Sequence, residues 1–83
     1  MWFLYIILTK NNKLYTGITT DVERRFEEHK SGLKGAKFLK SNPPKKIVYI
    51  EKLKDRSIAT KREIEIKKLS RKEKLELIDS FRD

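Results

Sequence analysis

Apolar residues form a continuous run near the N-terminus and return further along with the spacing of strands and helices. Residues 2–8 are apolar at every position, which predicts a strand covered on both faces. A polar turn at residues 10–13 separates this run from residues 14–18, which we expect to return as a second strand. Residues 47–50 form another apolar, β-branched run. The pattern therefore predicts a hairpin and a later third strand.

The remaining segments have the pattern of amphipathic helices. The first helix is expected to open at residues 20–23, where Thr20 and Glu23 have capping-box spacing, and to stop at Gly32. Residues 33–46 predict a loop with room for one short helical turn. Two further helices are expected, one capped by Ser57 and one by the capping box of residues 70–73. The buried stripe of the last helix is predicted to contain Leu75, Ile78 and Phe81.

These elements follow one another in the order β-β-α-β-α-α. A hairpin, a helix, a third strand and a helical end predict an α+β fold with a three-stranded antiparallel sheet flanked by helices. The chain has 83 residues, which is room for one modest core. We therefore expect residues 1–83 to be a single domain.

The composition is strongly basic. Twenty-one Lys and Arg against twelve Asp and Glu give a formal net charge of +9. Such an excess attracts polyanions, of which DNA and RNA are the expected partners, although a solvated basic surface would have the same composition. The apolar run at residues 2–8 is too short for a membrane span, so we expect no membrane partner. The absence of cysteine excludes disulfides and fits a cytoplasmic protein.

One helix carries candidate catalytic side chains. Asp21, Arg25 and His29 are four residues apart, so a helix would place them on one side. The Arg25 guanidinium could bind a phosphate through two parallel N–H hydrogen-bond donors. The alternative is structural, with Asp21 and Arg25 as an exposed ion pair and His29 half-buried. A single histidine without cysteine also excludes a zinc finger.

A wider spacing pattern joins that helix to the strands. Tyr5 in the first strand and Tyr15 in the second are ten residues apart, and Arg25, His29 and Glu63 follow in order. This order resembles the GIY-YIG nuclease superfamily, in particular its small, stand-alone bacterial branch, over nearly the whole chain. The first motif has Phe-Leu-Tyr at residues 3–5 in place of Gly-Ile-Tyr, and the second has Thr in place of Ile at position 16. Both departures keep the tyrosines.

The resemblance implies a metal-dependent nuclease that hydrolyses phosphodiester bonds. Arg25 would then stabilise charge on the attacked phosphate, and His29 would contact that phosphate or the nucleophile. Glu63 would hold a Mg²⁺ or Mn²⁺ ion, which suits a single carboxylate completed by waters and substrate oxygen. Tyr5 or Tyr15 would act as the base or would position the water; the residues do not decide between them.

The resemblance and the basic composition together predict a nucleic-acid surface. Its expected residues are Gly17, where the backbone approaches the substrate, and Arg24, Lys34, Lys37 and Lys40. DNA is expected rather than RNA, and the protein is expected to bind it as a monomer. Little sequence preference is expected, because larger relatives select their sites through additional domains. The alternative is a non-catalytic nucleic-acid-binding module that retains the nuclease fold. A protein-interaction module is a third possibility, based only on exposed charged helices.

The hairpin register provides a geometric test of this hypothesis. Side chains alternate between the two faces of a strand, so the loop length decides whether Tyr5 and Tyr15 share a face. A two-residue loop at residues 11–12 would separate them. A three-residue loop at residues 10–12 would bring them together, and the active-site hypothesis predicts this loop or a bulge.

Overall fold

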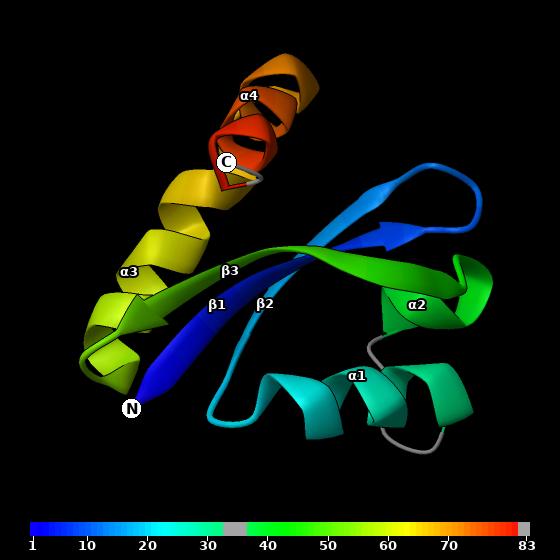
Figure 1. Cartoon of the computed structure of the whole chain (residues 1–83), viewed down its shortest axis with the longest axis horizontal. Helices are drawn as coiled ribbons and strands as arrows, with labels where there is room; N and C mark the ends of the chain where they lie inside the picture. The colour runs from blue at the N-terminus through cyan, green and yellow to red at the C-terminus, as the bar shows by residue number, and fades with distance from the viewer. Residues whose placement is uncertain (33–36, 82–83) are drawn as a thin grey trace.

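The fold is an antiparallel sheet with helices on both faces (Figure 1). The computed structural model describes residues 1–32 and 37–81. The predicted α+β class and element order are confirmed, and the short helix α2 lies in the segment where a loop with room for one short helical turn was expected. The elements are β1 (Trp2–Thr9), β2 (Leu14–Thr19), α1 (Val22–Ser31), α2 (Lys37–Ser41), β3 (Pro44–Leu53), α3 (Arg56–Lys67) and α4 (Arg71–Phe81).

The sheet has the order β2-β1-β3, with both neighbouring pairs antiparallel. β1 is the central strand, which explains why it is apolar on both faces. β3 is longer than the apolar run at residues 47–50 because its pairing with β1 continues to Pro44, which lies opposite Thr9. Proline is tolerated there because the first residue of a strand need not donate to the ladder.

The hairpin between β1 and β2 has the predicted three-residue loop, residues 10–12. The backbone N–H of Thr9 donates to the carbonyl of Lys13 at 2.9 Å, which closes the loop. Asn12 has a φ of 63°, a left-handed conformation that asparagine adopts more readily than most residues. In the resulting register Tyr5 lies opposite Gly17, and Ile7 lies opposite Tyr15. Tyr5 and Tyr15 therefore share one face of the sheet, as predicted.

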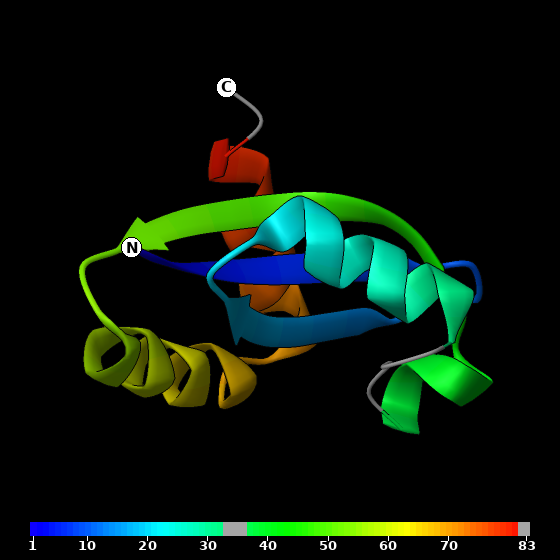
Figure 2. The same cartoon turned by 90° about the horizontal axis from the view of Figure 1, so that it is seen from below.

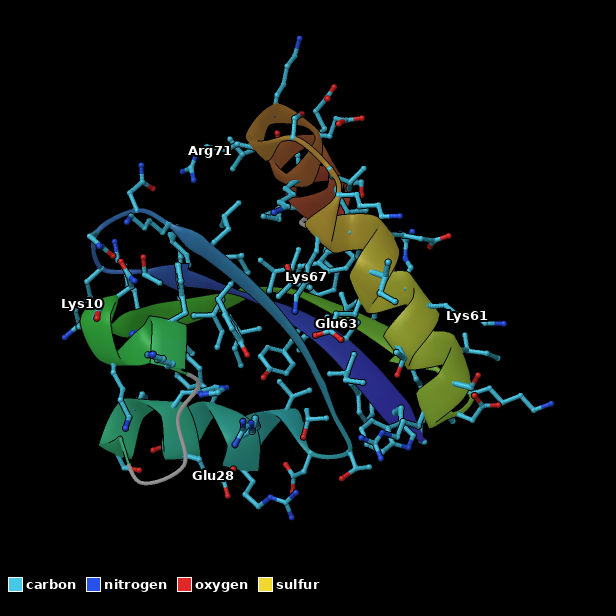
Figure 3. All side chains as sticks on the ribbon, turned by 180° about the vertical axis from the view of Figure 1, so that it is seen from behind. Lys10, Glu28, Lys61, Glu63, Lys67 and Arg71 are labelled. Carbon is cyan, nitrogen blue, oxygen red and sulfur yellow. The ribbon has the colours of Figure 1, made fainter. Side chains whose placement is uncertain are left out.

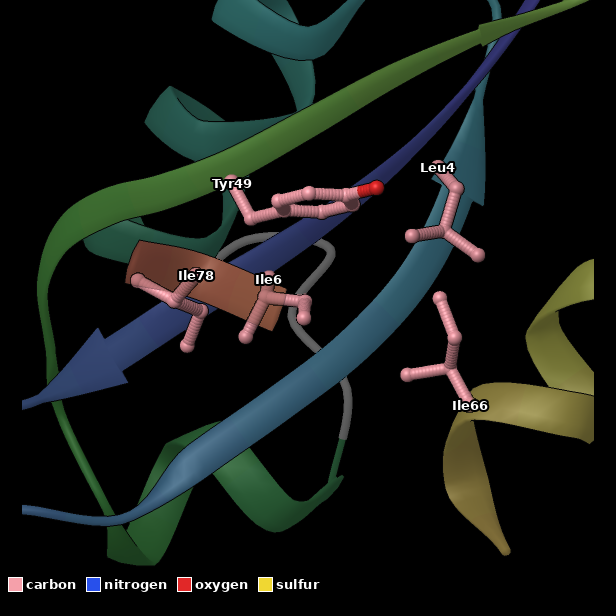
Figure 4. Close-up of a cluster of buried hydrophobic side chains, with 5 residues drawn as sticks. All are labelled: Leu4, Ile6, Tyr49, Ile66 and Ile78. Carbon is pink, nitrogen blue, oxygen red and sulfur yellow. The ribbon is translucent and has the colours of Figure 1, made fainter. Parts of the chain in front are cut away.

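The helices divide between the two faces of the sheet. α1 and α2 lie on one side of the strands and α3 and α4 on the other, with α2 and α3 nearer to β2 than to β3 (Figures 1 and 2). One core cluster lies under α3 and α4 (Figure 4) and contains Leu4, Ile6, Tyr49, Ile66 and Ile78. The other lies under α1 and α2 and contains Tyr5, Ile7 and Leu39.

Of four predictions about helix ends, two need correction and two are confirmed. α1 is capped by Asp21 rather than Thr20: the Asp21 carboxylate accepts from the N–H of Arg24 at 3.1 Å. α3 is capped by Asp55 rather than Ser57. In both cases a carboxylate one or two residues from the expected cap reaches the free amides. Gly32, with a φ of 77°, ends α1 as predicted, and the capping box of residues 70–73 is present before α4.

The predicted buried stripe of α4 is only partly correct. Ile78 is buried, but Leu75 and Phe81 are exposed, although the Phe81 ring meets the core residue Tyr49 edge-on. Leu77 packs against the core cluster instead. Within the described residues, no helix is both long enough and apolar enough to cross a membrane.

Candidate active site

Helix α1 brings two of the predicted residues to the sheet. Arg25 and His29 lie one turn apart, and the helix packs this side toward the strands, so that His29 is only 3% exposed. Asp21 does not continue this row, because its carboxylate caps the helix. The Arg25 guanidinium pairs with Glu28 at 3.2 Å, a partner that the sequence pattern did not indicate.

His29 meets both tyrosines in what we call the tyrosine–histidine cluster: Tyr5, Tyr15 and His29. The Tyr5 hydroxyl lies 3.0 Å from Nε2 of His29, within hydrogen-bond distance. The Tyr15 ring meets the imidazole edge-on, with centroids 5.6 Å apart, and lies 6.3 Å from the Tyr5 ring. Three positions that are distant in the sequence therefore form one contiguous group.

The two tyrosines differ in burial. Tyr5 is 2% exposed, whereas Tyr15 is half-buried at the rim of the cluster. Burial, reinforced by Tyr15, raises the pKa of Tyr5 to about 12, although its hydrogen bond with the Arg25 guanidinium opposes this shift. Tyr5 is therefore protonated at neutral pH, and it can act as a base only if it passes its own proton to a neighbour.

His29 is suited to receive that proton. Burial lowers the pKa of His29, and the positive charge of Arg25 lowers it further, against the opposing effect of Glu28. The imidazole is therefore neutral at neutral pH. If the Tyr5 hydroxyl donates to Nε2, the proton of the neutral ring is on Nδ1. Nδ1 is buried and has no hydrogen-bond partner in the described part of the chain.

Gly17 leaves the space in which the Tyr5 phenol lies. A Cβ on Gly17 would come within 2.6 Å of the Tyr5 hydroxyl oxygen and 2.8 Å of Cζ. No side chain fits at this position unless the buried phenol moves. Sequence analysis assigned Gly17 to the approach of a substrate, whereas the contact found here is with Tyr5.

Glu63 lies on α3, on the other side of the sheet from α1, and affects the cluster through its charge. It extends from α3 toward β2, beside Lys67 (Figure 3), and its negative charge adds to the rise of the Tyr5 pKa. Lys67 pairs with the Glu63 carboxylate at 3.1 Å. Among the described residues, no group of three or more His, Cys, Asp or Glu side chains could hold a metal ion. A single carboxylate fits Mg²⁺, which retains most of its waters and binds substrate oxygen, provided that Lys67 gives way.

Of the predicted nucleic-acid residues, Gly17 lies against Tyr5 of the cluster, and three others are exposed on the helices. Arg24 is exposed on α1, and Lys37 and Lys40 are exposed on α2. Lys34 lies outside the described residues. Sequence analysis missed Phe38, whose ring stacks on Tyr15 with centroids 6.0 Å apart. The signal that could have indicated Phe38 was the pair of apolar residues at positions 38 and 39, which lies inside a segment rich in lysine.

Comparisons with known proteins agree with this arrangement. Residues 1–76 match the family described as the GIY-YIG catalytic domain. The UPF0213 protein YhbQ of Escherichia coli (strain K12) is 49% identical over 77 residues, which are 93% of this chain and 76% of that protein.

Two solution NMR structures have a similar fold, each 38% identical in sequence. The UPF0213 protein BH0048 from Bacillus halodurans matches with a TM-score of 0.60, covering 95% of this chain and 84% of that one. The protein EF2693 from E. faecalis matches with a TM-score of 0.64, covering 96% and 84%. The chain therefore belongs to the GIY-YIG catalytic domain family of nucleases.

Proposed function

We propose that this protein is a metal-dependent nuclease that hydrolyses phosphodiester bonds of DNA with little sequence preference. The observation that carries the proposal is the position of the Tyr5 hydroxyl. It is hydrogen-bonded to His29 and Arg25 and lies within the field of Glu63. In this proposal these residues supply a base, a phosphate clamp and a hard oxygen ligand, which phosphodiester hydrolysis requires.

Proton transfer in this proposal starts from the attacking water. The water oxygen bonds to phosphorus while its proton moves to the Tyr5 hydroxyl and the Tyr5 proton moves to Nε2 of His29. The ester P–O bond breaks, and the leaving oxygen takes a proton from solvent. A neutral His29 is needed for this step, and the lowered pKa of the imidazole provides it.

The other residues of the site have separate parts. Arg25 is half-buried and places its positive charge beside the cluster, where it can stabilise the charge that develops on the phosphoryl oxygens. Tyr15, half-buried at the rim, can contact the substrate beside the attacked phosphate. Glu63 would hold Mg²⁺ or Mn²⁺, which when bound supplies positive charge to the phosphate and acidifies water.

A non-catalytic nucleic-acid-binding module is the second candidate. The observation that favours it is the ion pair between Lys67 and Glu63, because the ammonium group occupies a carboxylate oxygen that a metal would need. The basic surface and the cluster would be retained in either case.

A cleavage assay separates the two candidates. Labelled single-stranded, duplex and branched DNA are incubated with the protein in Mg²⁺, Mn²⁺ or EDTA. Glu63→Gln is compared with Glu65→Gln, a matched control on the same helix whose carboxylate pairs with Arg62. Metal-dependent cutting that is lost in Glu63→Gln and kept in Glu65→Gln supports the nuclease. Binding without cutting on any substrate, unchanged by Glu63→Gln, supports the binding module.

A further inference from the structure

We propose that Phe38 is a stacking platform for an unpaired base, so that the site takes single-stranded DNA. The inference rests on the proposed function, because it names the substrate class of the same site. An exposed aromatic ring is not unusual by itself, since isolated apolar side chains are common on protein surfaces. Three observations distinguish Phe38 from such a residue.

The first observation is the contact between Phe38 and the cluster. Its ring stacks on Tyr15 with an interplanar angle of 23°, and Tyr15 in turn meets His29. Phe38 is nevertheless 39% exposed. Because Tyr15 covers one part of the ring, the exposed area belongs to the remainder. The aromatic surface of the cluster therefore continues through Phe38 to solvent.

The second observation is the fixed backbone at Phe38. Its carbonyl accepts hydrogen bonds from both the backbone N–H and the side-chain amide of Asn42, at 3.1 and 2.9 Å. The Asn42 side-chain oxygen accepts from Asn11 in the hairpin loop at 2.6 Å. The neighbouring Leu39 is buried in the core. The backbone at Phe38 is thus fixed before any ligand arrives and its ring is stacked on Tyr15, which lowers the entropic cost of binding.

The third observation is the charge around the ring. Lys37 and Lys40 flank Phe38 on the same short helix and are exposed. Aromatic rings among lysines bind single strands, because the bases stack on the rings while the cations track the phosphates. An internal base of a duplex is stacked on both sides and must be unstacked at a cost before a ring can contact it. Phe38 therefore favours strands whose bases are already unpaired.

Equilibrium binding in EDTA tests this inference without any cutting. Fluorescence anisotropy is measured with a strand of about 20 thymidines, longer than one binding site, with an abasic strand of equal length, and with a duplex. The wild type is expected to prefer the thymidine strand. Phe38→Ala is expected to weaken binding of that strand about 5- to 150-fold and to leave the abasic strand unaffected.

Two further variants keep the test independent of folding. Phe38→Leu retains apolar cover over Tyr15 and is expected to lose the base preference, whereas Phe38→Trp is expected to keep it. Phe81→Ala is the matched control, because Phe81 is an exposed phenylalanine on α4 whose ring packs on Tyr49. Its binding of all three ligands is expected to equal that of the wild type.

The results distinguish this inference from the proposed function. Wild-type affinity of Phe38→Leu for the thymidine strand would overturn the stacking role, as would an equal loss of affinity for all three ligands. If the base preference depends on Phe38 but the protein cuts no DNA in Mg²⁺ or Mn²⁺, the stacking role of Phe38 is supported and the proposed nuclease activity is refuted. Metal-dependent cutting with no effect of Phe38 on binding refutes only the platform.

Discussion

Replacing Gly17 with alanine tests how the site is packed. The added Cβ would lie 2.6 Å from the Tyr5 hydroxyl oxygen, and ordinary contact begins at 3.4 Å. The oxygen must therefore move by the difference, about 0.8 Å. Tyr5 is buried and its hydroxyl is bonded to His29 at 3.0 Å, so this movement stretches or breaks that hydrogen bond.

Two opposing terms set the expected loss of stability. Overpacking a buried site costs about 1–3 kcal/mol. Alanine recovers roughly 0.4–1 kcal/mol of that cost by restricting the unfolded chain. We therefore expect Gly17→Ala to lower the free energy of unfolding by about 1–2 kcal/mol. Catalysis depends more steeply on position, so that a displacement of this size reduces cleavage about 100-fold.

Gly32→Ala is the matched control. Gly32 has a φ of 77°, and among the described residues outside its own helix and chain neighbours a Cβ there would meet no atom within 4 Å. Its replacement costs about 1–2 kcal/mol of backbone strain and leaves Tyr5 undisturbed. Urea unfolding and metal-dependent cleavage are measured for both variants. The packing argument is refuted if Gly17→Ala matches the wild type in both assays, or if both variants lose the same fraction of activity.

Three further predictions concern stability. Because the pKa of His29 is lower in the folded chain than its ordinary 6.5, the unfolded chain binds the proton more tightly. Stability in urea unfolding should therefore fall as the pH is lowered through 6.5, and less so in His29→Gln. Ile66→Ala should cost about 2–5 kcal/mol in urea unfolding, and Ile64→Ala, 50% exposed, less than about 0.5. Asn42→Ala should cost about 1–3 kcal/mol in urea unfolding, since it removes two side-chain hydrogen bonds, to the Phe38 carbonyl and from Asn11; an unchanged midpoint would contradict this.

Much of the fold followed from local patterns. The continuous apolar run of residues 2–8 identified the central strand, because only a strand covered on both faces is apolar throughout. The requirement that Tyr5 and Tyr15 share a face led to the three-residue loop, which the register confirms. The helix caps were less predictable, since neighbouring Ser, Thr and Asp residues compete for the same amides.

Most candidate residues of the site could be named in advance, but their side-chain contacts could not. The sequence indicated the family through the spacing of Arg25 and His29 on a helix, together with two tyrosines and a later glutamate. The match over residues 1–76 now shows that family. The catalytic roles of these residues stay predictions. The order of these residues is read directly from the sequence, and local periodicity is sufficient to assign each residue to a strand or a helix.

Tertiary packing decided what each residue contacts. It buried Tyr5 and left Tyr15 at the rim, stacked Phe38 on Tyr15, and filled the space above Gly17 with a phenol. It also paired Glu63 with Lys67. Distances between side chains on different elements depend on how the helices pack on the sheet. Burial of these side chains shifts their pKa values by removing solvent. Neither quantity is encoded by spacing along the chain, so only the folded structure provides them.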